Sequence, residues 1–121
     1  MRWNKIKSLP SVQFRRVVGI KKETFEMFGQ ILRPKWKLRR QRGGAKPKLG
    51  LENQLLLMLS YLRHYSTFIE TGAKFGVSES RAWSICRWVE DILIAAKVMH
   101  LPGKKELLKS SEKGVTFDVT E

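Results

Sequence analysis

Hydrogen-bonding side chains gather at the start of a helix that the sequence predicts from Glu79 to about Val98. Ser78 can cap this helix, and its buried face would consist of Ala82, Ile85, Cys86, Val89, Leu93 and Ala96. The outward face would then carry Ser78, Glu79, Ser80, Trp83, Ser84 and Arg87, with Arg81 beside them. Such groups can read base edges and flanking phosphates from the major groove of DNA. Two alternatives stay open: Trp83 could pack into the core, and Glu79 could serve only the helix dipole.

A second set of candidate side chains is uniformly cationic and lies between positions 33 and 48. It consists of Arg33, Lys35, Lys37, Arg39, Arg40, Arg42, Lys46 and Lys48, with no acid among them. Phosphate contacts supply most of the non-specific affinity for DNA. Residues 51–101 hold equal numbers of bases and acids, so we expect affinity from the cationic segment and readout from the helix. Trp36 could stack on an exposed base or tuck against neighbouring helices.

The charge distribution limits the function classes. Residues 1–50 hold fifteen of the 24 Lys and Arg but two acids, so the whole formal net charge of +13 lies there. This charge favours a polyanionic partner, of which nucleic acid is the commonest inside a cell, over a solvated basic face. No apolar run is long enough for a bilayer and no signal-peptide core follows Met1. The single cysteine, Cys86, excludes an intramolecular disulfide and a cysteine-built zinc site. We therefore expect a cytoplasmic protein with no membrane partner, no bound small molecule and no cofactor.

The segment from Gly72 to Ile85 has the pattern of a helix-turn-helix. A capping box at Thr67 and Glu70 starts a short helix, Gly72 or Ala73 allows two helices to cross closely, and Gly76 permits a turn with positive φ. Val77 would plug the turn into the core. The motif requires the helix after the turn to present its outward face to DNA.

The remaining elements complete an all-α prediction. Residues 1–32 are predicted to form two short helices. Ser11 would cap the first and Gly19 would end it, and Pro34 would end the second. The pair could pack on the rest of the domain or dimerise. Residues 33–50 form a flexible basic linker rich in Pro and Gly. Residues 51–101 form the helix-turn-helix domain, opening with an amphipathic helix from Gly50 to about His64 whose apolar stripe is Leu51, Leu55, Met58, Leu59 and Leu62. Residues 102–121 form a tail that ends on a strand-like alternation.

The order of these features resembles bacterial insertion-sequence transposases of the DDE, RNase H-like type. The resemblance is carried by Gln54–Tyr65, Phe75–Ser80 and Trp88–Glu90, by Phe14–Arg16, Gly19, Ile20 and Phe25, and by Phe117–Glu121. It implies a bacterial, nucleoid-associated protein that recognises transposon ends. It also implies that Asp118 is the first of three acidic ligands for Mg²⁺, with the other two beyond Glu121.

The resemblance implies that the chain is a truncated or first-frame part of such an enzyme. Two-metal phosphoryl transfer needs several carboxylates around a pair of cations, so we expect the chain alone to be catalytically inert. His64 and His100 have no ligand-like spacing. A helix-turn-helix transcriptional repressor is the alternative function, and an RNA-binding protein is disfavoured because no RNA module is recognisable.

Overall fold

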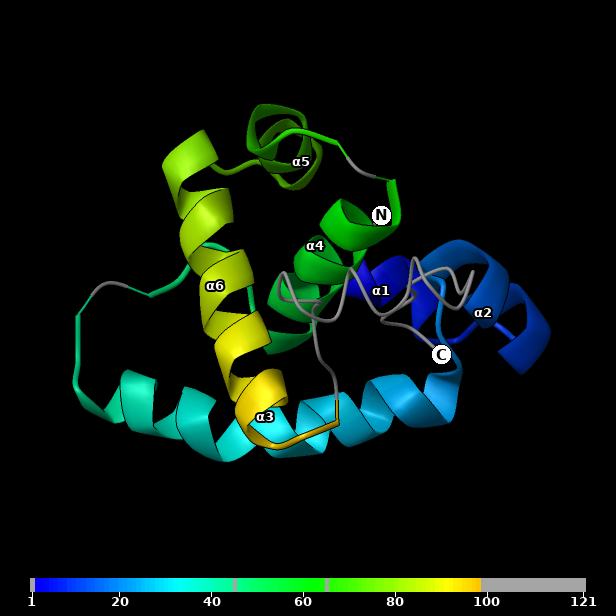
Figure 1. Cartoon of the computed structure of the whole chain (residues 1–121), viewed down its shortest axis with the longest axis horizontal. Coiled ribbons are helices and arrows are strands. Elements are labelled where there is room, and N and C mark those ends of the chain that lie inside the picture. The colour runs from blue at the N-terminus through cyan, green and yellow to red at the C-terminus, as the bar shows by residue number, and fades with distance from the viewer. Residues whose placement is uncertain (1, 45, 65, 99–121) are drawn as a thin grey trace, which may run out of the picture.

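The computed structural model describes residues 2–44, 46–64 and 66–98, which form helices and their connections (Figure 1). In chain order the helices are α1 (Trp3–Ile6), α2 (Ser11–Val18), α3 (Lys22–Gln41), α4 (Leu51–His64), α5 (Phe68–Phe75) and α6 (Glu79–Ala95). The all-α prediction is confirmed over these residues. The predicted tail and strand at 102–121, including Asp118, lie outside the described residues.

Helix α4 lies at the centre and contacts α1, α2, α3, α5 and α6. Leu51, Leu55, Met58 and Leu59 are buried as predicted, whereas Leu62 is only partly buried. Burial extends further around the helix than the predicted stripe, to Gln54, Leu56, Leu57 and Ser60. A surface helix would expose that side, so the excess burial follows from neighbours packing around α4.

The N-terminal helices belong to the same hydrophobic core as α4 and α6. Trp3 stacks on Phe25 with ring centroids 4.9 Å apart, and Phe14 meets both rings edge-on. Helix α1 was not predicted, because four residues are too few for a periodic pattern. Gly19 ends α2 with φ +102° as expected, but the predicted cap at Ser11 is wrong: Pro10 is the N-cap and Ser11 is the first helical residue.

The largest departure from the sequence prediction is α3, which continues through Pro34 to Gln41. Five of the eight cations of the predicted flexible linker therefore stand on a helix, and the connection to α4 starts only at Arg42. An interior proline costs about 3 kcal/mol because it removes a backbone hydrogen bond. Contacts on both sides of the proline offset that cost: Arg33, just before it, pairs with Glu52 at 2.7 Å, and Trp36, two residues after it, packs on Trp88 of α6. Figure 1 shows α3 as the long helix along the lower edge of the view, with α6 descending onto it.

Gly72 lies where α5 comes close to the backbone of the turn that leads into α6. A Cβ at Gly72 would lie 2.6 Å from the carbonyl oxygen of Val77. Ala73, the alternative crossing residue, is exposed, so Gly72 has the predicted role. We expect Gly72→Ala to destabilise the protein by about 1–3 kcal/mol, because the backbone of the turn must shift.

Gly29 provides a matched control on α3. An added Cβ there meets nothing within 4 Å, so Gly29→Ala should stabilise the helix by about 0.5–1 kcal/mol. Urea unfolding followed by circular dichroism measures both variants. Equal changes in the two would contradict the crossing assigned to Gly72.

Candidate nucleic-acid interface

The α5–turn–α6 unit is held by the local hydrogen bonds that the sequence predicts. The Thr67 hydroxyl accepts a hydrogen bond from the Glu70 amide at 3.1 Å, and the Ser78 hydroxyl accepts one from the Arg81 amide at 3.2 Å. Gly76 ends α5 with φ +73°. The two caps and this glycine fix where α5 ends and α6 begins.

Arg2 braces this turn from the other end of the chain, a contact that sequence reasoning missed. Its guanidinium donates a hydrogen bond to the Phe75 carbonyl at 2.8 Å and lies 5.7 Å from the centre of the Phe75 ring. The bond satisfies a backbone carbonyl at the end of α5 that the helix leaves unpaired. No local pattern signals a pairing between positions 2 and 75.

The predicted rotational phase of α6 is confirmed by its burial. Ala82, Ile85, Cys86, Val89 and Leu93 are buried, whereas Ser78, Glu79, Ser80, Arg81, Trp83, Ser84 and Arg87 are exposed. Trp83 is 50% exposed, so its alternative role in the core is wrong. Ala96 was predicted to be buried but is exposed, because α6 ends at Ala95 and the positive φ of Lys97 turns the chain.

A basic groove of about 450 Å³ runs between the C-terminal end of α3 and the start of α6. Its cationic lining residues are Arg39, Arg40, Lys46, Lys48 and Arg81, and Ser78 and Ser84 of α6 also line it. The structure thus brings part of the predicted cationic segment against one side of the predicted recognition helix. We call this surface the basic groove.

Aromatic packing holds the wall of the basic groove in place. The rings of Trp36 and Trp88 meet edge-on with centroids 6.2 Å apart, and the Arg39 guanidinium lies 4.7 Å from the centre of the Trp88 ring. Trp36 is partly buried, so of its two predicted roles the structure shows packing against a neighbouring helix. These contacts pack the C-terminal half of α3 against α6 beside the cations of the groove.

The cations of the groove are close enough to perturb one another. Partial burial lowers the pKa of Arg39 from its usual value, and the nearby charges of Arg81 and Arg42 lower it further. No acid lines the groove among the described residues. An anion placed there would relieve this repulsion, and regularly spaced phosphates are such anions.

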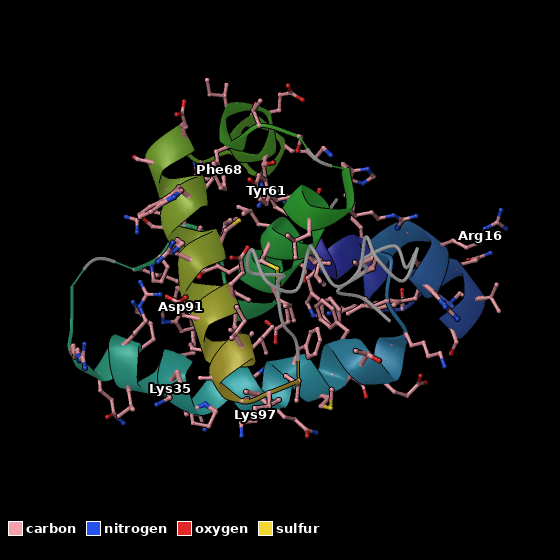
Figure 2. The ribbon with its side chains drawn as sticks, in the orientation of Figure 1. Arg16, Lys35, Tyr61, Phe68, Asp91 and Lys97 are labelled. Atoms are coloured by element: carbon pink, nitrogen blue, oxygen red, sulfur yellow. The ribbon has the colours of Figure 1, made fainter. Side chains whose placement is uncertain are left out.

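The other predicted cations lie outside the groove lining. Arg33 is paired with Glu52 across α3 and α4, and Lys35, Lys37 and Arg42 are exposed on or just after α3. Figure 2 shows Lys35 on the outside of that helix. Their contacts with DNA stay predictions.

The titratable groups outside the groove form no reactive constellation in the described ranges. Burial and the charges of Lys74 and Arg63 lower the pKa of His64. Burial, with Glu90 nearby, raises the pKa of the Cys86 thiol to about 12, and burial and Asp91 raise the pKa of Glu90. Within residues 2–98, apart from positions 45 and 65, no group of three His, Cys, Asp or Glu is placed to hold a metal ion. No helix in the same part of the chain is long and apolar enough to cross a membrane.

Comparisons with known proteins agree with this geometry. Residues 47–96, which contain α4 to α6, match the family model described as the helix-turn-helix of DDE superfamily endonuclease. The whole chain is similar to a probable transposase for insertion sequence element IS702 from Microchaete diplosiphon, with 39% identity over 126 residues. The chain spans 44% of the length of that relative. No solved structure matches the chain. The helix-turn-helix part of the chain is thus similar to that of DDE superfamily endonucleases, and the chain as a whole is similar to part of an insertion-sequence transposase.

Proposed function

We propose that the chain binds double-stranded DNA in transposition, and that it recognises the ends of the mobile element through α6. One observation carries the proposal: the basic groove lies beside the exposed face at the start of α6, and Ser78, Arg81 and Ser84 line the groove from that helix. A helix in the major groove needs phosphate contacts on its flank to fix its register. The end of α3 supplies those contacts.

The two surfaces divide the work of binding. The cations of the basic groove bind phosphates regardless of sequence, which supplies affinity. The exposed polar side chains of α6 reach base edges, which supplies the discrimination between sequences. The chain is similar to an insertion-sequence transposase, and that class of enzyme acts on the ends of its own element. The ends of the element that encodes the chain are therefore the DNA to test.

Catalysis lies outside this proposal. Asp118 lies outside the described residues, and its role as a metal ligand stays a prediction from the family resemblance. The expected inertness of the chain alone stays a prediction, and so does the dimerisation that the sequence leaves open.

The proposal is tested by fluorescence anisotropy with labelled duplexes. One duplex carries the terminal inverted repeat of the element that encodes the chain, and the other has the same composition in scrambled order. We expect the repeat to bind at least about 1000-fold more tightly, the lower end of specific recognition. Equal affinities for the two duplexes would contradict the proposed recognition of the element's ends. Absence of binding to either duplex would contradict DNA binding itself.

A further inference from the structure

The exposed face of α6 holds a second recess, whose chemistry differs from that of the basic groove. It is lined by Phe68, Ser78, Glu79, Ser80 and Trp83. Two aromatic side chains form its apolar walls, one at the start of α5 and one on α6. Ser78 lines both the recess and the basic groove, so the two surfaces are continuous. We call this surface the aromatic recess.

Both aromatic walls are braced by neighbouring side chains. The Phe68 ring stacks on Tyr61 of α4 with centroids 4.3 Å apart and an interplanar angle of 10°. The Arg87 guanidinium lies 5.6 Å from the centre of the Trp83 ring. Figure 2 shows Phe68 and Tyr61 close together where α5 meets α4. The recess is therefore a preformed feature of the surface.

The lining of the aromatic recess does not suit a phosphate. Among the described residues that line it there is no Lys or Arg, and the one charged side chain is the carboxylate of Glu79, which repels anions. Its two aromatic walls, Phe68 and Trp83, offer contact to an apolar group on the DNA. Among the base edges of the major groove, the prominent apolar group is the C5-methyl of thymine.

We propose that the aromatic recess binds the C5-methyl group of a thymine, so that Trp83 and Phe68 determine specificity at that base pair. This inference rests on the proposed function, because it requires α6 to enter the major groove. Trp83 is exposed near the start of α6, and the recess meets the basic groove at Ser78. A methyl group placed between the two rings loses its contact with water, which favours thymine over bases that lack it.

The test removes only the methyl group. In the preferred duplex of the anisotropy experiment, each thymine is replaced in turn by deoxyuridine, which leaves base pairing intact. We expect one or two positions at which the affinity falls about fourfold, equivalent to about 0.8 kcal/mol for one buried methyl. Trp83→Ala should bind the thymine and deoxyuridine duplexes equally at those positions.

Two further variants control for indirect effects. Trp83→Phe keeps an apolar wall and should retain part of the discrimination. Ile94→Ala removes another exposed apolar side chain near the far end of α6 and should retain all of it. A circular dichroism melt confirms that each variant is folded.

The outcomes separate this inference from the proposed function. If the wild-type chain binds the duplex tightly but tolerates deoxyuridine at every position, the thymine contact is wrong and DNA binding stands. Discrimination that survives in Trp83→Ala would also overturn the contact. If no duplex binds at all, both proposals fail together.

Discussion

Replacing Arg39, Lys48 and Arg81 together by Gln is expected to weaken binding to every duplex and to flatten its dependence on salt. The affinity K falls as salt rises, and each lost phosphate contact makes the slope of log K against log salt less steep by about 0.9. Loss of three contacts therefore makes it less steep by about 2.7. If the variant and the wild-type chain bind equally at 1 M salt, this corresponds to a loss of affinity of about 170-fold at 0.15 M. The three residues come from α3, from the connection before α4, and from α6, so the variant tests the whole groove.

The matched control removes the same charge elsewhere. Arg15, Arg16 and Lys21 are exposed on or after α2, and Figure 2 shows Arg16 at the opposite end of the molecule from α6. Their triple replacement by Gln should change the slope little. A control variant that flattened the slope as much as the groove variant would mean that net charge, rather than the groove, provides the affinity.

Replacing Ile85 by Ala is expected to destabilise the fold by about 2–5 kcal/mol, because a buried aliphatic side chain leaves a cavity. Ile85 is buried on the core side of α6. Arg87→Ala, two residues further on, should change stability by about 0.5 kcal/mol or less, since its side chain is exposed. It should instead weaken binding to DNA.

The two variants are compared by denaturant melts and by anisotropy on the same preparations. The expected pattern is opposite in the two measurements: Ile85→Ala mainly lowers stability, and Arg87→Ala mainly lowers affinity. If Arg87→Ala were the strongly destabilising change, the assignment of the two faces of α6 would be wrong.

The helix-turn-helix could be predicted from sequence because its determinants are local. The Thr67 cap acts on an amide three residues away, Gly76 sets its own φ, and the period of apolar residues from Ala82 to Leu93 defines one face. Each of these signals lies within a few residues of the structure it specifies. For the same reason, the outward face of α6 could be named before its surroundings were known.

The groove could not be predicted because its determinants are distant in sequence. Repulsion between the like charges and the presence of Pro34 both favour a flexible linker, because each raises the free energy of a helix through these residues. They are outweighed by packing of Trp36 and Arg39 on Trp88, which lies some fifty residues further along the chain. Because α3 continues to Gln41, a deletion of residues 33–48 would remove about half of this helix and its packing on α6. Point substitutions are therefore the suitable test of the groove.

The central claim is that the end of α3 and the start of α6 form one DNA-binding surface. Amide chemical shifts of the ¹⁵N-labelled chain, recorded by NMR during titration with the repeat duplex, test it directly. We expect the shifts of residues 39–49 and 76–87 to change together, with the same dependence on duplex concentration, while those of α2 stay unchanged. Changes confined to 79–87, or centred on α2, would contradict it.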